Sequence, residues 1–250
     1  MVESWEEMLP AVPSSLPLGG VLHRTDPSGA RTAKIAFLGV YPAATKLDRW
    51  RHNGQTYQLP VGVERTSFDP ESRSGTEVDA RYLAPLRLSR DDVLLFDMMP
   101  YFLANTSNSG NEARSMWSNV QLYERVTCTK TAVRPRPEPD ELLVECERIP
   151  GNHERLKSIF RSATNLRLLF TLGNEAAAFV RCISHAKDAQ KHLYEPPEGG
   201  VRAVLGRTGV CVVHLAHPGL LIKNTRWRQK HATWCEKTGQ ELVRKVLGTC

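Results

Sequence analysis

The sequence lacks several features that would assign a function directly. No apolar run approaches the ~18 residues that a membrane-spanning helix needs, and the acidic stretch of residues 1–7 shows no signal-peptide pattern. There is no internal repeat, no GxGxxG turn and no phosphate-binding P-loop, so nothing supports a bound nucleotide cofactor. We therefore expect a cytosolic protein that has no cofactor and no membrane contact.

Cysteine is present, but not in a metal-binding pattern. No two cysteines form a CxxC pair, and their spacings are wide and uneven, which argues against a zinc site. In a chain without an export signal we expect free thiols and no metal. The six cysteines are Cys128, Cys146, Cys182, Cys211, Cys235 and Cys250.

Positive charge is in excess and is separated from negative charge. The net charge is +6, and residues 217–231 contain four Lys or Arg and no acid, whereas residues 138–147 contain five acids. A basic stripe of this kind suits a phosphate backbone. A solvated surface is the alternative that charge alone leaves open.

Four short apolar runs alternate with segments of helical pattern. Buried strands separated by helices predict an α/β fold with a central four-stranded, mainly parallel sheet flanked by helices. We expect an N-terminal arm over residues 1–32 and a single domain over residues 33–250. Polar loops are expected at residues 48–80, 104–112 and 185–200. The predicted strands lie at residues 34–40, 92–97, 166–172 and 211–215, and the predicted helices at 112–126, 140–148, 153–163, 175–183 and 227–247.

Ligands of such sheets bind beyond the carboxyl ends of the strands, and four short motifs lie there. They are a Gly-x-x-Pro turn at 39–43, the segment Phe-Asp-Met-Met-Pro at 96–100, a Leu-Gly-x-x-Ala-Ala helix start at 172–177 and a His-Pro-Gly-Leu motif at 217–220. These motifs resemble those of the uracil-DNA glycosylase superfamily and occur in the family's order, with residues 96–100 at the family's base-reading segment. The resemblance covers about residues 34–247.

This resemblance implies a monofunctional DNA glycosylase, a hydrolase that flips a base out of DNA and cleaves its N-glycosidic bond. His217 would stabilise the base anion by a hydrogen bond, and Leu220 or Leu221 would enter the vacated stack. We expect a monomer that binds single- or double-stranded DNA. The residues expected to contact DNA are Pro42, Ala43, Pro218, Gly219, Leu220, Lys223, Asn224, Arg226 and Arg228.

A flipped base also needs an aromatic face to stack on. Residues 54–57 resemble the family's Gly-x-x-Phe, so Tyr57 is the predicted face and Tyr41 a second wall. Tyr41 also occupies the position where classical members hold a water-positioning acid. The candidates for that acid are Asp48 and Asp97, and the sequence does not choose between them.

Asp97 stands where the family reads uracil with Asn. An ionised Asp only accepts hydrogen bonds, and cytosine presents an amine donor, so the substitution favours cytosine or a modified cytosine. The alternative is that Asp97 caps a loop or that the motif is shifted by a residue or two. The long polar loops suggest a larger pocket, similar to that expected of phage-defence glycosylases that remove glucosylated hydroxymethylcytosine.

Other interpretations remain open at this point. One is a uracil or mismatch glycosylase active in base-excision DNA repair. Another is a non-catalytic nucleic-acid module on the same fold, which the loss of the acid at Tyr41 permits. A third is a different α/β hydrolase using His217 and Asp97, although no nucleophile elbow is present. The segment from Cys128 to Cys146 resembles half of an iron–sulfur site, but no cysteine precedes it, and we expect no cluster.

Overall fold

The structure is a computed structural model that describes residues 26–42, 47–60, 67–107, 115–131, 133–184, 193–194, 202–205 and 208–248. Residues 1–25 of the predicted N-terminal arm lie outside the described part, as do most of the predicted loop at 185–200 and part of that at 104–112. The arm does not extend to residue 32, because Ser28–Gly29 already form an edge strand of the sheet.

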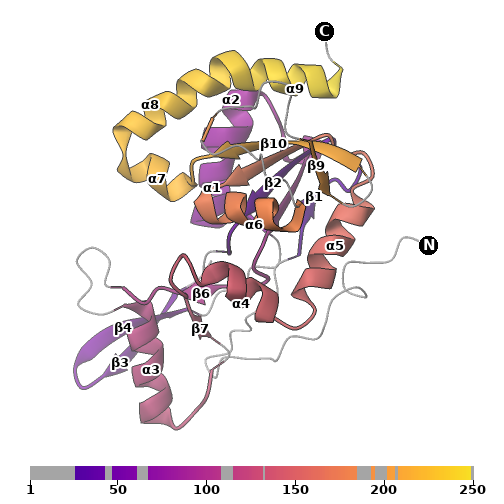
Figure 1. Ribbon diagram of the computed structural model, residues 1–250. Coiled ribbons are helices and arrows are strands. Elements are labelled where there is room, and N and C mark those ends of the chain that lie inside the picture. Colours follow the sequence, from indigo (N-terminus) through magenta and orange to yellow (C-terminus); the bar gives the residue numbers. More distant parts are fainter. Residues whose placement is uncertain are drawn as a thin grey trace.

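The core of the protein is a six-stranded sheet rather than the four-stranded one predicted (Figure 1). Its four central strands are parallel and correspond to the four predicted apolar runs, which confirms the α/β assignment. An antiparallel strand closes each edge. In spatial order the strands are β1 (Ser28–Gly29), β5 (Val93–Asp97), β2 (Ile35–Gly39), β8 (Leu168–Leu172), β10 (Thr208–Leu215) and β9 (Arg202–Leu205).

Helices cover both faces of the sheet, which is why the central strands are continuous apolar runs. Every residue of β2, β5 and β8 is buried. One face packs against α4 (Leu142–Arg148), α5 (Asn152–Ser162) and α6 (Asn174–Ser184). The other face packs against α7 (Pro218–Lys223) and against two interrupted helices. The first consists of α1 (Arg73–Val78), η1 (Asp79–Leu83) and α2 (Ala84–Leu86). The second consists of α8 (Thr225–Trp234), η3 (Cys235–Gly239) and α9 (Gln240–Leu247).

The predicted C-terminal helix is confirmed, with two differences. A separate short helix, α7, precedes it, and a π-helical turn, η3, interrupts it. Gly248 ends it, with a left-handed φ of 76°. Among the described residues, no helix is both long and apolar enough to cross a membrane.

The prediction of an irregular loop over residues 48–80 was wrong. Residues 47–60 form a β-hairpin of β3 (Leu47–His52) and β4 (Gln55–Pro60), and residues 73–86 are helical. Asn53 and Gly54 both have positive φ at the tip, the signature of a tight two-residue hairpin turn. The hairpin packs on α3 (Met116–Thr127), and near α3 the short strands β6 (Leu103–Ala104) and β7 (Arg134–Pro135) pair in parallel. The 3₁₀ turn η2 (Arg90–Asp92) leads into β5.

A buried arginine fixes the carboxyl end of β5. Arg155 of α5 is 2% exposed, and its guanidinium donates to the main-chain oxygens of Asp97 (2.7 Å) and Met98 (3.0 Å). Its Nε donates to Asn152, whose amide in turn donates to Met98 (3.0 Å). Asn152 is the first residue of α5, and its buried side chain binds these groups rather than capping the helix. The end of β5 is held by charge-assisted hydrogen bonds from the helix beside it.

Replacing Arg155 should destabilise the fold. In Arg155→Met, the buried carbonyl oxygen of Asp97 loses its donor and that of Met98 loses one of its donors, and we expect the free energy of unfolding in urea to fall by about 2–4 kcal/mol. The matched control is Arg161→Met, because Arg161 is exposed on the same helix, and it should change stability by less than about 0.5 kcal/mol. Equal effects of the two substitutions would contradict this role for Arg155.

Candidate functional site

A pocket of about 240 Å³ opens at the carboxyl ends of the parallel strands, where ligands of such sheets bind. This volume lies just below the range for drug-sized ligands and suits a small ring system. The last residues of β2, β5 and β8 and the residues just after β2 and β10 meet there with α1 and α7. The lining residues are Gly39, Val40, Tyr41, Pro42, Phe68, Arg73, Ser74, Glu77, Asp97, Leu172, His217, Pro218, Gly219, Ile222 and Lys223.

The floor of the pocket depends on a glycine. A Cβ at Gly39 would lie 2.1 Å from Oδ1 of Asp97 and 2.5 Å from the ring of Phe68. Only glycine leaves space for both groups at the end of β2. Phe68 itself has a left-handed φ of 55°, which is costly for a side chain of this size. Its segment is held by Ser67, whose amide donates to Asp26 and whose carbonyl oxygen accepts from Ser28.

Asp97 is a buried carboxyl group with an abnormal pKa. It is 1% exposed, and its Oδ2 has no hydrogen-bond partner among the described residues. Burial raises the pKa of Asp97 from its ordinary value near 4 to about 7, against the opposing effects of the Ser67 hydroxyl and the Arg155 guanidinium. The protonated form of Asp97 therefore persists to a much higher pH than that of an ordinary aspartate. A protonated carboxyl offers one donor and one acceptor, whereas the ionised form only accepts.

His217 presents a defined tautomer to the pocket. Its Nδ1 accepts from the amide of Gly219 at 3.1 Å, so in the neutral ring the proton is on Nε2. His217 is an exposed residue, but the protein atoms around its ring still desolvate it and lower its pKa, an effect that Glu175 opposes and Arg136 assists. A neutral imidazole that donates from Nε2 can stabilise developing negative charge on a ligand.

Hydrogen bonds to two tyrosines hold the backbone just before His217. Tyr82 donates to the carbonyl oxygen of Ala216 at 2.6 Å, and the amide of Ala216 donates to the hydroxyl of Tyr194 at 3.2 Å. His231 lies 3.0 Å from the Tyr194 hydroxyl and donates from Nε2 to the carbonyl oxygen of Arg81 at 2.6 Å. Helices α1–α2 and α8 thereby fix the backbone that carries His217.

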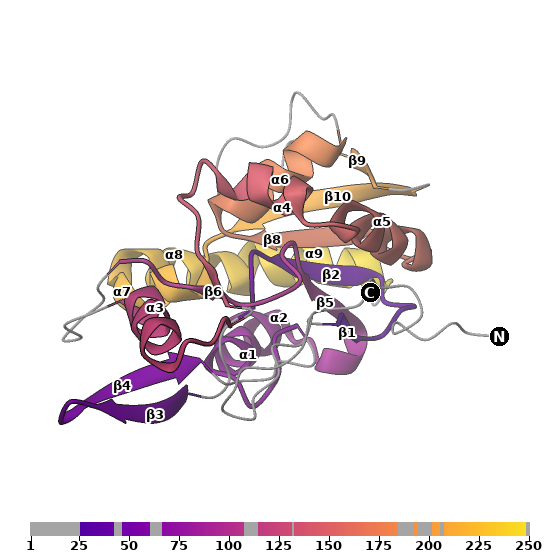
Figure 2. The same ribbon diagram turned by 90° about the horizontal axis from the view of Figure 1, so that it is seen from below.

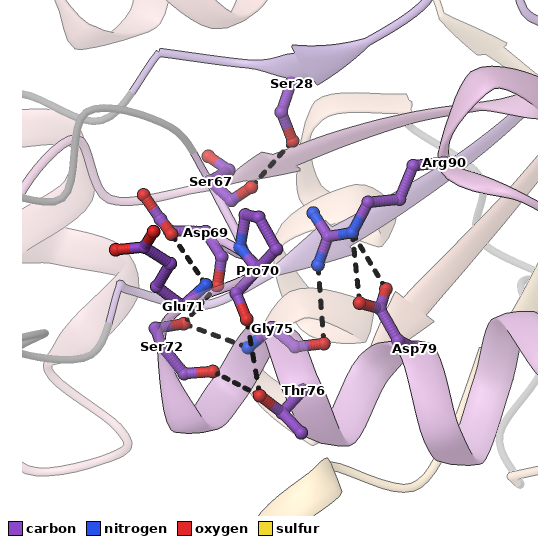
Figure 3. A network of polar contacts seen from close by, with 10 residues as sticks. All are labelled: Ser28, Ser67, Asp69, Pro70, Glu71, Ser72, Gly75, Thr76, Asp79 and Arg90. Atoms are coloured by element: carbon purple, nitrogen blue, oxygen red, sulfur yellow. Dashed lines mark hydrogen bonds and ion pairs between the residues drawn. The ribbon is translucent and has the colours of Figure 1, made fainter.

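The wall formed by α1 is held by a network at its start (Figure 3). Ser72 caps the helix by accepting from the amide of Gly75, and its hydroxyl donates to Asp69. Arg90 donates to the carbonyl oxygen of Gly75 and pairs with Asp79 at 2.9 Å. This anchoring orients the first turns of α1, which carry three polar pocket residues: Arg73, Ser74 and Glu77.

The structure brings together most of the residues predicted from the strand ends. Asp97 lies on the pocket floor rather than capping a loop. Tyr41 lines the pocket and carries the Arg136 guanidinium over its ring at 4.9 Å, and burial raises its pKa. Ala43 lies outside the described residues. The predicted residues that line the pocket are Tyr41, Pro42, Asp97, His217, Pro218, Gly219 and Lys223.

Two predicted residues lie elsewhere. Asp48 and Tyr57 belong to the β3–β4 hairpin and do not line the pocket. Tyr57 packs against Trp50 with ring centroids 5.4 Å apart, and its hydroxyl donates to Gln55. The aromatic side chains that line the pocket are instead Phe68 and Tyr41.

In the predicted DNA-contacting segment, some side chains are exposed and others are buried or hydrogen-bonded within the protein. Leu220 is 36% exposed, whereas Leu221 is fully buried, so of the two only Leu220 can project from the protein. Asn224 caps α8 by accepting from Trp227, and Arg228 donates to carbonyl oxygens at the end of α7. Lys223 is exposed beside the pocket mouth, and Arg226 is exposed on α8.

Sequence reasoning missed Phe68, Arg73, Ser74 and Glu77, because it assigned their segment to one long loop. A helix signal was present in the sequence: Ser72 is a favoured N-cap residue, and α1 begins directly after it.

Within the described residues, no group of three or more His, Cys, Asp or Glu could hold a metal ion. No protein-family model matches the chain, and no curated protein matches it either.

The raised pKa of Asp97 predicts a pH-dependent stability. Between about pH 4 and pH 7 the folded protein binds a proton that the unfolded chain releases, so the free energy of unfolding falls as the pH rises through this window, by at most about 1.4 kcal/mol per pH unit. Asp97→Asn removes the group, so its stability relative to the wild type should increase from pH 4 to pH 7 and then level off.

Urea denaturation of both proteins at several pH values measures this difference. Asp91→Asn is the control, because Asp91 is exposed and precedes the same strand. A difference between Asp97→Asn and the wild type that stays constant with pH would contradict the raised pKa.

Proposed function

We propose that the protein is a monofunctional DNA glycosylase with a uracil-DNA glycosylase-like fold, which hydrolyses the N-glycosidic bond of a non-canonical base and leaves an abasic site. The observation that carries this proposal is the pocket at the strand ends. There an aromatic ring, a buried carboxyl group and a histidine that donates from Nε2 surround a space for one ring system. Flipped bases require stacking, edge recognition and leaving-group stabilisation, and these three groups supply them.

Phe68 and Tyr41 provide surfaces for the base, and Asp97 reads its edge. A protonated Asp97 donates to a ring nitrogen and accepts from an adjacent amine, which is the pattern that cytosine presents. The choice of a cytosine derivative therefore no longer requires an ionised Asp97. We propose a modified cytosine as the substrate, and glucosylated hydroxymethylcytosine of phage DNA is the first derivative to test.

His217 acts on the leaving base. Cleavage of the glycosidic bond leaves negative charge on the base, and a hydrogen bond from Nε2 stabilises that charge more in the transition state than in the substrate. The depressed pKa of His217 keeps the ring neutral at physiological pH. Outside the pocket, Leu220 fills the vacated stack, and Lys223 and Arg226 neutralise phosphates.

Glu77 supplies the acid that Tyr41 replaces. Besides Asp97 it is the other carboxylate among the described residues that line the pocket, and it forms an ion pair with Arg81, four residues further along the same helical segment. A carboxylate here orients the attacking water or stabilises positive charge on the sugar. Asp97, in contrast, is too buried and too readily protonated for that role. Tyr41 also favours a second candidate function, a DNA-binding module without catalysis.

Base release from a panel of DNAs tests the function. DNA carrying uracil, mismatches, hydroxymethylcytosine or glucosylated hydroxymethylcytosine is incubated with the protein, and free bases are identified by mass spectrometry. We expect a modified cytosine to be released, with strand breaks only after alkali. His217→Ala should lower the rate by about 10²-fold or more, whereas His153→Ala, an exposed residue of α5, should not.

Binding without release of any base by the wild type would favour the non-catalytic module. Breaks that form without alkali would rule out a monofunctional enzyme. A His217→Ala protein that retains the wild-type rate would overturn the role of His217.

Glu77→Gln separates catalysis from folding. The substitution keeps the shape of the side chain, so we expect base release to fall by about 10²-fold or more while DNA affinity and stability change little. Glu71→Gln is the control, because Glu71 is exposed just before the same helix. Single-turnover release measured beside DNA binding checks both parts, and unchanged release in Glu77→Gln would exclude Glu77 as the acid.

A further inference from the structure

We infer that the β3–β4 hairpin is a second DNA-binding element, an arginine-bearing arm that contacts the phosphates of duplex DNA beside the pocket. The inference rests on the proposed function for the choice of DNA as partner. It concerns a surface that is separate from the pocket, since no described hairpin residue is among those that line the pocket.

The two faces of the hairpin differ in chemistry. On one face Asp48, Trp50 and His52 are partly buried, and Trp50 packs edge-on against Tyr123 of α3 with ring centroids 5.2 Å apart. On the other face Arg49 and Arg51 are exposed and stand opposite the uncharged Gln58 and Thr56. That free face carries two cations and no acid.

The arginines are available for a partner. Among the residues that the structure describes, no acid forms an ion pair with Arg49 or Arg51. Two neighbouring guanidinium groups spaced along one strand match the repeated charges of a phosphate backbone. A two-stranded ribbon is also one of the elements that the major groove of DNA admits.

The hairpin is a rigid arm rather than a loose loop. Trp50 stacks on His52 with an interplanar angle of 7°, and the side-chain amide of Asn119 in α3 donates to the main-chain oxygen of Gln58 at 3.1 Å. Leu59 is buried in a small cluster with Val120 of α3. A preorganised arm loses little entropy when it binds.

The arm projects on the same side of the molecule as the basic segment of α7 and α8. In both Figure 1 and Figure 2 the hairpin, α3 and α7 extend to the left, the side toward which the carboxyl ends of the parallel strands point. A duplex whose flipped base enters the pocket can therefore meet Lys223 and Arg226 with one part and the hairpin with another.

Salt-dependent binding to unmodified duplex DNA tests the arm without requiring catalysis. In Arg49→Ala/Arg51→Ala we expect the slope of log affinity against log salt to become shallower by about 2, and the affinity near 0.1 M salt to fall roughly tenfold or more. Arg49→Lys/Arg51→Lys keeps both charges and should keep most of the slope.

The matched control is Arg161→Ala/Arg167→Ala, which removes two exposed arginines near the amino end of β8 and should leave the slope nearly unchanged. Equal losses in the two double alanine variants would overturn the inference, because net charge alone would then explain them. Unchanged binding in the hairpin variant, or no binding by the wild type, would overturn it too. A wild type that binds DNA through the hairpin but releases no base would leave the arm in place and refute the proposed glycosylase.

Discussion

The burial of one carboxyl group, that of Asp97, constrains the whole functional end of the molecule. Its main-chain oxygen is held by Arg155 from one face of the sheet, and its side chain lies beside Phe68 from the other. The close approach of these groups is possible only because β2 ends in Gly39. A charged group without partners is costly to bury, so the protein accommodates it by raising its pKa to about 7. The same cost makes the group ready to interact with a ligand.

The pocket combines rigidity with unused hydrogen-bonding capacity. Arg155, Tyr82 and Tyr194 all bind main-chain atoms next to Asp97 and His217, and so leave the side chains themselves free to face the pocket. This division of labour is what a preorganised site requires, because donors that are already oriented need no rearrangement when charge develops.

The four central strands could be predicted from the sequence, and so could the parts of the site that carry Asp97 and His217. The part that carries Phe68 and Glu77 was missed. Continuous apolar runs such as residues 35–39 and 93–97 identify buried parallel strands, and strand ends then identify Asp97 and His217. Phe68 and Glu77 were missed because their segment is polar and because its helix is too short to show a clear helical repeat before the π-helical turn η1 interrupts it. Their contribution depends on tertiary contacts, including those of Ser67 with Asp26 and Ser28. The hairpin could have been found from Asn53–Gly54.

Gly39 has a consequence for how such a protein can change over time. Because any side chain at this position would collide with Asp97 and Phe68, a substitution of Gly39 requires one of these two residues to move or change as well. The walls come from α1 and from the segment after β2, whose exposed or half-buried residues can vary without disturbing the sheet. New ligand preferences would therefore arise more readily by mutation of the walls than by mutation of Gly39.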